Sequence, residues 1–343
     1  MNHIIIQKSD GSAESHLDNL RVLFEKLEIP FKKGNSVGVK IHWGELGNHS
    51  YLSPMYTAAI VSWLRTRDIS PLVFDTTVLY SGGRRTGEDA LKTAHDHGFT
   101  EKFLGCPVII ADGMDGRSVI DIEARYKHFE HVQVADIVRK CDGFIIFSHF
   151  KGHLGAGFGG CIKNISMGFA SRAQKQRMHA DAHPVLQKKL CTRCGTCADI
   201  CPAGAITITP PDFPEFNLAA CLGCAQCIAL CPEVALKIFW NADNRVFLER
   251  LVETAAAVWK HIHDKTICIN ALIKVTTDCD CLPGDHSIIA PDTGFIGGTH
   301  PIAVDKESVR QVGGAIITQA HPSIPWDHQF SYAHEIGFDD DHK

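Results

Sequence analysis

The sequence predicts an α/β protein in which a parallel or mixed sheet is covered by helices on both faces and carries a small inserted α+β domain. Two observations predict this architecture. Short apolar runs alternate with amphipathic stretches of helical spacing along most of the chain, which is typical of strands and helices in a covered sheet. Eight of the fourteen cysteines lie between residues 191 and 231, with the alternating pattern on both sides. We therefore assign 1–185 and 241–343 to one discontinuous α/β domain and 186–240 to the insertion.

The elements of the α/β domain follow from local patterns. Helical spacing marks 13–29 and 245–263. A further helix is predicted over 53–68, because Ser53 is a favourable N-cap and Pro54 a favourable first helical residue. Strands are predicted where the runs are short and apolar, at 3–7, 36–42, 70–77, 106–112, 141–147 and 265–272.

Composition excludes several classes of function. With 343 residues the chain is long enough for one large domain and an attached module, and 45% hydrophobic and 21% charged residues are ordinary values. The net charge of −5 provides no basic field for nucleic acid or an anionic membrane. The apolar stretch at the N-terminus is too short for a signal peptide or a membrane span, so we expect a cytoplasmic location.

The clustered cysteines form two copies of the pattern C-x2-C-x2-C-x3-C-P, which begin at residues 191 and 221. This is the pattern of bacterial ferredoxins with two [4Fe–4S] clusters, in which the fourth cysteine of each copy ligates the other cluster. A zinc site uses four ligands, usually as two pairs, and does not account for two triplets that each end in Cys-Pro. Short strands are expected at 203–208 and 233–239, with a turn-rich linker at 208–220. The predicted ligand sets are Cys191, Cys194, Cys197 and Cys231 for one cluster, and Cys221, Cys224, Cys227 and Cys201 for the other.

Polar residues gather where predicted strands end. In covered α/β sheets the ligand crevice lies outside the carboxyl ends of the strands. A single histidine in such a place is more often a solvated or core residue, but here three strand ends converge. The residues concerned are His42 after one strand, Asp75, Thr76 and Thr77 after the next, and His149, Lys151 and His153 after a later one.

The glycine-rich segment after His153 matches G-x-G-x-x-G at Gly155, Gly157 and Gly160. In a dinucleotide site these glycines follow the strand directly, whereas here residues 148–154 intervene. We expect instead that the glycines let the backbone approach a ligand or the cluster module closely. The polar series that follows is expected to close over the crevice, although an exposed helix face is the alternative for Arg172 and Lys175. This series is Lys163, Asn164, Arg172, Lys175 and His179.

Two further motifs are candidates for binding and chemistry. Arg84 and Arg85 follow two glycines and precede a helix that Thr86 could cap, an arrangement suited to a carboxylate or a phosphate; the alternative is a pair of solvated arginines. Cys279 and Cys281 are two residues apart, so in a strand both thiols would point to one face. They could bind a further metal or donate a proton, or they could be buried inert thiols.

Several of these segments together resemble a known family. The segment 149–172 (HFKGHLGAGFGGCIKNISMGFASR), the double cysteine motif, the Asp-Cys-Asp-Cys sequence and residues 290–305 resemble the iron–sulfur proteins grouped as domain of unknown function 362. The resemblance covers nearly the whole chain and implies an iron–sulfur or ferredoxin-like protein without assigning an activity. The family ending is nearer to DPVAID, whereas this chain has HPIAVD, with His300 in place of the aspartate.

Two classes of function remain open. In the first, low-potential electrons pass through the two clusters to a small-molecule substrate in the crevice, such as an anion with a polarised C=C or C=O bond. The catalytic candidates are His149, Lys151, His153, Lys163, His42, Cys279 and Cys281, and the anion-binding candidates are Arg84, Arg85, Asn164 and Arg172. In the second, the protein is a non-catalytic electron carrier or handles a metal. A redox partner such as ferredoxin, flavodoxin or a reductase is expected in the first class, and an additional metal, a flavin and self-association stay open.

Overall fold

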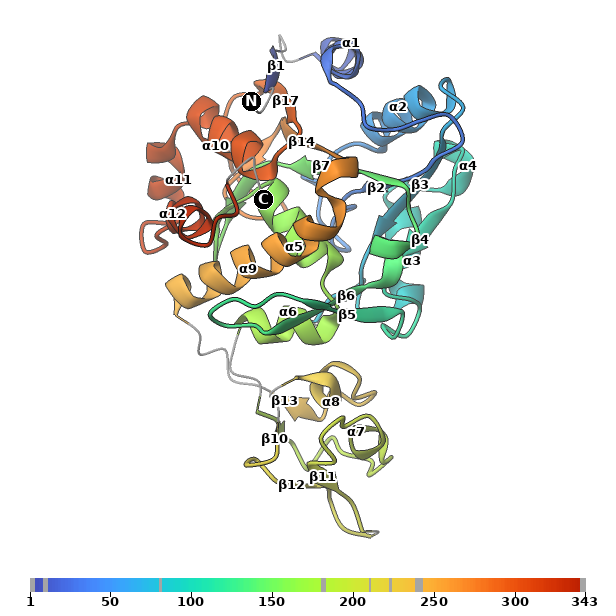
Figure 1. Ribbon diagram of the computed structural model, residues 1–343, viewed down its shortest axis with the longest axis vertical. Coiled ribbons are helices and arrows are strands. Elements are labelled where there is room, and N and C mark those ends of the chain that lie inside the picture. The colour runs from blue at the N-terminus through green and yellow to red at the C-terminus, as the bar shows by residue number, and fades with distance from the viewer. Residues whose placement is uncertain are drawn as a thin grey trace.

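The computed structural model describes residues 4–8, 12–79, 82–179, 183–209, 211–221, 224–237 and 243–339. Its main part is a helix-flanked sheet of seven strands in the order β1-β17-β14-β7-β2-β3-β4 (Figure 1). The strands β14, β7, β2, β3 and β4 run parallel, and β17 and β1 continue the sheet in antiparallel fashion at one side. The sheet is therefore mixed, as predicted. Its strands are β1 (Ile5–Lys8), β2 (Ser36–Lys40), β3 (Ser70–Asp75), β4 (Val108–Ile110), β7 (Gly143–His149), β14 (Thr266–Leu272) and β17 (Gly294–Gly298).

Helices cover both faces of the sheet and bury two apolar cores. On one face Leu23, Ile60 and Ala94, from three helices, pack against sheet residues such as Val39. On the other face Ile165, Leu251 and Ile302 pack against the opposite side chains of the same strands. The helices of the first face are α1 (Ala13–Lys26), α2 (Pro54–Arg65), α3 (Gly87–Asp96) and α4 (Glu101–Leu104), and those of the second include α5 (Cys161–Phe169), α9 (Asn244–Ile262), α10 (Pro301–Val312), α11 (Gly314–Ala320) and α12 (His328–Glu335).

The remaining elements of this part are short. Three two-stranded antiparallel sheets lie outside the main sheet: β5 (Val119–Glu123) with β6 (His131–Ala135), β8 (Lys151–His153) with β9 (Gly157–Gly159), and β15 (Val275–Thr276) with β16 (Ile288–Ala290). The helix α6 (Arg172–His179) and the 3-10 turns η1 (Asp136–Arg139) and η2 (His263–Lys265) complete it.

The helix starts agree with their predicted caps. Ser53 Oγ accepts a hydrogen bond from the N–H of Met55, and Thr86 Oγ1 accepts one from the N–H of Asp89. His300, where the family resemblance implies aspartate, caps α10 through its Nδ1, which accepts from the N–H of Ile302. Aspartate is itself a favoured N-cap, so the histidine takes over that structural role.

Residues 183–237 form a separate lobe, called here the cysteine lobe, below the sheet in Figure 1. Its halves repeat: Gly195 and Ala225, thirty residues apart, both have positive φ, and each starts a four-residue helix. Gly204 and Val234 repeat in the same way. The elements of the lobe are β10 (Val185–Leu186), α7 (Thr196–Asp199), β11 (Ile206–Thr207), β12 (Glu215–Phe216), α8 (Gln226–Ala229) and β13 (Leu236–Lys237).

Three segments of the main part contact the cysteine lobe: α6, the loop of Arg85 and β6. Ala173 of α6 packs into the lobe's small core beside Cys227. Arg85 Nη2 donates to the carbonyl oxygen of Cys231 at 3.0 Å, and Gln226 Nε2 donates to Gln133 Oε1 at 2.6 Å. The expected short strands at 203–208 and 233–239 are present as β11 and β13. The predicted domain limit at 240/241, the start of the predicted first strand at His3, and Ser81 of the arginine motif lie outside the described residues.

Candidate functional site

A large cavity, with a volume of about 160 Å³, lies at the carboxyl edge of the parallel strands. The cavity opens beside β2, whose neighbours in the sheet are β3 on one side and β7 on the other. The chain passes from β2 to β3, and the strands of this sheet that follow β4 in sequence join it on the opposite side of β2. Ligands bind at this kind of switch point in open α/β sheets. Nine of the eleven residues predicted for catalysis or anion binding line it: His42, Arg84, His149, Lys151, His153, Lys163, Asn164, Cys279 and Cys281.

Asp280 lies behind one wall of the cavity and contacts two residues of that wall. Its side chain is fully buried and accepts from His149 Nδ1 at 2.9 Å and from the ammonium of Lys151. Burial opposes its ionisation, but the charges of His149 and Lys151 outweigh burial and hold the pKa of Asp280 well below its usual value. The other ring nitrogen of His149 faces the carbonyl oxygen of Ile273 at 2.8 Å. His149 and Lys151 therefore fix the segment around Asp280.

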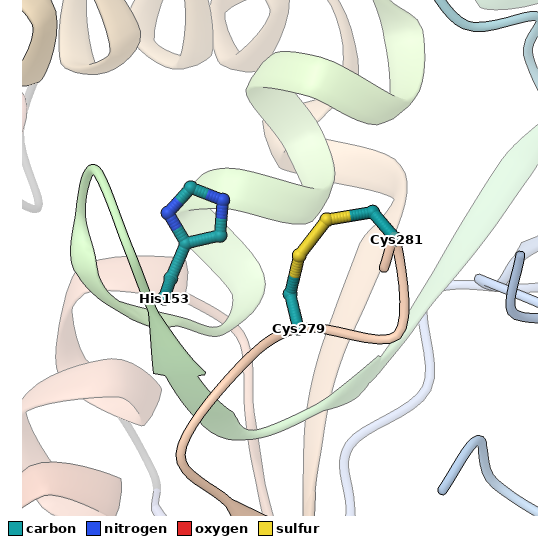
Figure 2. Close-up of side chains that lie close together, drawn as sticks. All are labelled: His153, Cys279 and Cys281. Carbon is teal, nitrogen blue, oxygen red and sulfur yellow. A yellow bond between two sulfur atoms is a disulfide. The ribbon is translucent and has the colours of Figure 1, made fainter. Parts of the chain in front are cut away.

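Cys279 and Cys281 flank this aspartate and point away from it, into the cavity. They lie in a turn and not in the strand that the spacing suggested, yet both sulfurs face the same side. A disulfide joins them, with Cα atoms 5.2 Å apart. Figure 2 shows the ring of His153 facing the sulfurs. One ligand atom of each of these three residues lies within 4.8 Å of the others, so the group could hold a metal ion if the disulfide were reduced.

Arg84 connects residues of the opposite wall through hydrogen bonds. Its Nε donates to Glu45 Oε2 at 3.1 Å, and its Nη1 donates to His42 Nε2 at 2.9 Å and to Asp75 Oδ2 at 3.4 Å. The N–H of Gly83 also donates to Glu45, so the anion that the glycine–arginine motif binds here is a carboxylate of the protein itself. Burial and then the charge of Arg84 lower the pKa of His42 well below its usual value, which keeps the ring neutral.

Lys40, which the sequence did not single out, lies at the floor of the cavity. Its ammonium contacts Asp75 Oδ1 at 2.9 Å and donates to Asn164 Oδ1 at 2.8 Å. Asn164 in turn donates to the carbonyl of Phe147 and to Ser148 Oγ. Asn164 thus joins β2, β7 and α5. A methyl group at Gly168 would lie 2.2 Å from Lys40 Cε, so a side chain at this position would displace the end of Lys40 from its present contacts.

Lys163 differs from the other buried cations. Lys175 donates to Thr76 Oγ1 at 2.7 Å and to the carbonyl of Thr77, but Lys163 has no hydrogen-bond or ion-pair partner within the described ranges. Burial, and then the neighbouring charges of Lys151 and Arg84, lower the pKa of Lys163 to about 7. Its amino group therefore faces the cavity with no carboxylate of the described residues in contact to compensate its charge.

His153 and His179 adjoin Lys163 and carry no charge. Burial and then Lys163 lower the pKa of His179 to about 4, and the same two causes, in that order, lower the pKa of His153 well below its usual value. His153 Nδ1 accepts from the N–H groups of Gly155 and Ala156 at 3.1 and 3.0 Å. The neutral ring therefore carries its proton on Nε2.

The cysteine lobe contains two small cavities of about 20 Å³ each, and each is lined by four cysteines. The residues suit the thiolate ligation of iron–sulfur clusters. The N–H groups of Ala205 and Ala235 each donate to a cysteine sulfur four residues earlier, at 3.3 Å in both halves. One set of four is Cys191, Cys194, Cys197 and Cys231, and the other is Cys201, Cys221, Cys224 and Cys227.

Arg85 and Arg172, the other two predicted anion ligands, do not line the large cavity. Arg85 donates to the cysteine lobe, as described above. Arg172 is buried near Arg85, and burial together with that charge lowers its pKa to about 10. The sequence reasoning also missed Glu45 and did not assign Asp280 a role. The available sequence signal for Asp280 was a charged residue between two cysteines. For Lys40 the signal was a lysine at the end of an apolar strand.

The fold and the cavity together define a mixed-sheet α/β protein with a cavity at the carboxyl edge of its strands. Residues 37–310 match the family described as Domain of unknown function (DUF362), and the chain belongs to that family. The cysteine content indicates metal binding. None of the curated proteins matches the chain.

Two solved structures match most of this chain. One is the crystal structure of a protein from Thermotoga maritima, with 11% identity and a TM-score of 0.46 over 89% of this chain and 60% of that one. The other is the lactate racemase apoprotein from Thermoanaerobacterium thermosaccharolyticum, with 11% identity and a TM-score of 0.44 over 90% and 57%. The chain thus spans about three fifths of the length of either protein. In the part of the chain that the structure describes, no helix has the length and apolar character needed to cross a membrane.

Proposed function

We propose that the protein is an iron–sulfur oxidoreductase that reduces a small anionic compound in the large cavity. The eight cysteines of the lobe would hold two [4Fe–4S] clusters in the crossed arrangement predicted from the sequence. Bound clusters would supply single electrons at low potential. An active site in the main part would explain why so large a domain accompanies the cysteine lobe.

One observation carries the proposal: two of the segments that line the cavity also contact the cysteine lobe. Arg84 lines the cavity, and the next residue, Arg85, donates to the carbonyl of Cys231. In α6, Lys175 lines the cavity and Ala173 packs beside Cys227. The cavity and the cysteine lobe are therefore separated by no more than one loop and one helix.

The charges of the cavity favour an anionic ligand. Five cations line it, and Asp75 is the one carboxylate among the described lining residues. Glu45 and Asp280 compensate Arg84 and Lys151 from behind the wall. Lys163 is left to bind a carboxylate or an enolate-like oxygen, and the Nε2–H of His153 provides a second donor beside it.

The test uses anaerobically purified protein with its natural metal content. After reduction with dithionite and removal of the excess, it is mixed with crotonate or pyruvate, which represent anions with polarised C=C and C=O bonds. We expect at least one of these classes to reoxidise the protein, as seen in the visible absorbance. The Lys163→Met variant should keep its iron and lose about a hundredfold in that rate.

A small one-electron oxidant provides the control, because it should reoxidise the wild type and Lys163→Met at equal rates. If neither class of anion reoxidises the protein while the one-electron oxidant does, the carrier function is favoured instead. A flavin found in the purified protein would also require a different assignment of the electron path.

A further inference from the structure

We propose that Cys279 and Cys281 form a reversible dithiol–disulfide couple in the wall of the large cavity, which exchanges two electrons and two protons with a dithiol. The proposal rests on the cavity being the ligand site proposed above, but it does not depend on the clusters. Four features of the site support it: the anchoring of the turn, the small loop that the disulfide closes, the charges around it and the tautomer of His153.

The turn that carries the cysteines is held by groups other than the disulfide. Asp280 is fixed by His149 and Lys151, and its carbonyl oxygen accepts from the N–H of Glu45 at 2.7 Å. A disulfide between residues two apart closes a very small loop, and the stabilisation expected from loop closure is smallest for such loops. We therefore expect this disulfide to contribute little to the stability of the fold, which distinguishes it from a structural cross-link.

The surroundings favour the reduced, ionised form of the pair. Cationic neighbours stabilise a thiolate, and the ammonium groups of Lys151 and Lys163 line the same cavity as both sulfurs. Cys281 is partly exposed whereas Cys279 is buried. An incoming thiolate would therefore reach Cys281 Sγ, and Cys279 would leave as the thiolate.

The electrons and protons balance as in ordinary thiol–disulfide exchange. The thiolate of a small dithiol, or of a dithiol protein, attacks Cys281 Sγ, and the bond to Cys279 Sγ breaks. The second thiol of the reductant then displaces Cys281 from the mixed disulfide. The reductant ends as its own disulfide, and the pair has gained two electrons and two protons.

The tautomer of His153 favours this couple over a metal centre at the same three residues. A metal ligand must offer a lone pair, and the other ring nitrogen usually donates its N–H to an acceptor. Here Nδ1 accepts two backbone N–H groups, so the proton stays on Nε2. An N–H group can donate to a thiolate, but it cannot ligate a metal.

The test measures the redox state of the pair directly in the full-length, anaerobic protein. Samples are equilibrated with dithiothreitol at a series of reduced-to-oxidised ratios, treated with iodoacetamide and analysed by peptide mass spectrometry. We expect Cys279 and Cys281 to become alkylated together and reversibly, with a two-electron dependence on the ratio. Cys141 is buried outside the cavity, and burial raises its pKa to about 11, so it should stay unmodified throughout.

Two variants sharpen the result. In Cys279→Ser, Cys281 should be alkylated at every ratio. In His153→Asn the amide oxygen can still accept from the backbone, as Nδ1 does, but the Nε2–H is lost. Alkylation of the reduced pair near neutral pH should then slow by about fivefold, the effect of losing one hydrogen bond to a thiolate.

Three outcomes would overturn the couple. They are a pair that resists reduction at every ratio, a pair that cannot be reoxidised, and one equivalent of zinc retained by the reduced protein and lost in both Cys279→Ser and His153→Asn. If the couple titrates but anions do not reoxidise the reduced protein, the couple stands and the reductase proposal fails. The opposite pattern removes the couple and leaves the reductase proposal intact.

Discussion

Asp280 shows how a single buried carboxylate can organise a site. It lies between two cysteines in sequence, and its partners His149 and Lys151 come from a strand end more than a hundred residues earlier. All three side chains are almost completely buried. Removing one partner of a buried ion pair leaves the other charge uncompensated, which costs more than the pair itself contributes.

We therefore expect Asp280→Asn to lower the free energy of unfolding by about 3 kcal/mol or more. The pKa of Asp280 is lowered in the folded protein, so its contribution is present above the unfolded pKa of about 4 and is lost as the pH falls below it. The difference between wild type and variant, measured by urea unfolding, should shrink in acid. Asp285→Asn is the matched control, because the pair of Asp285 with His49 is exposed. Equal effects of the two substitutions would contradict the role of Asp280.

Lys163 is expected to titrate near neutrality. Its pKa of about 7 means that the ammonium is lost as the pH rises through 7, so anion binding that needs it should weaken above that pH. The rate of acetylation by acetic anhydride, followed by mass spectrometry from pH 6 to 10, measures this pKa. Lys33, whose side chain is 80% exposed, serves as the reference, because its amino group stays in contact with water. A similar profile for both lysines would remove Lys163 as the uncompensated cation.

At the scale of elements, the two halves of the cysteine lobe repeat with a period of thirty residues but exchange their fourth cysteines. Cys201 lines the cavity of the second triplet, and Cys231 lines that of the first. Each Cys-Pro segment therefore crosses to the other half. The short strands and four-residue helices are too small to fold on their local contacts alone, so bound metal would contribute to their stability.

The crossing can be tested with pairs of alanine variants. Two clusters require about eight irons per chain, and each single variant should lose one cluster. Cys201→Ala combined with Cys224→Ala removes two ligands of the same predicted cluster, so it should leave as much iron as either single variant. Cys201→Ala combined with Cys194→Ala should lose nearly all of the iron. The reverse pattern, measured by iron analysis, would mean that Cys201 belongs to the first cluster.

At the scale of the whole molecule, the cysteine lobe is attached through a narrow connection. Val185 and Lys237 are paired in a two-stranded antiparallel sheet, so the chain enters and leaves the lobe at the same place. The cores of the two parts are separate apart from Ala173 of α6. Deleting the lobe should therefore disturb little beyond α6, the loop of Arg85 and Gln133 of β6.

We expect the main part to fold when residues 186–240 are replaced by a short Gly/Ser linker, because closing a short loop between adjacent ends costs little entropy. Circular dichroism and a cooperative urea transition measure the outcome. The comparison is the urea transition of the main part in the full-length, metal-loaded protein. Its midpoint should lie at an only slightly higher urea concentration. A deletion protein without a cooperative transition would show that the two parts share a core.

Much of the fold was predictable because its signals are local. The apolar runs at 141–147 and 265–272 became adjacent central strands, and the Ser-Pro and Thr86 caps begin their helices as expected. The convergence of His42 and His149 at one edge followed from the parallel direction of their strands. The Cys-Asp-Cys segment was the exception: it forms a turn, because Asp280 is drawn inward by partners that no local pattern indicates.

The sequence by itself determined the spacing of the cysteines, the alternation of elements and the placing of reactive residues after strands, since each of these depends on neighbours along the chain. The tertiary structure alone decided which charges are compensated. Lys151 meets Asp280, Arg84 meets Glu45, and Lys163 meets no carboxylate within the residues described. Such pairings join residues distant in sequence, and their effect on pKa depends on burial, which only the packed molecule fixes.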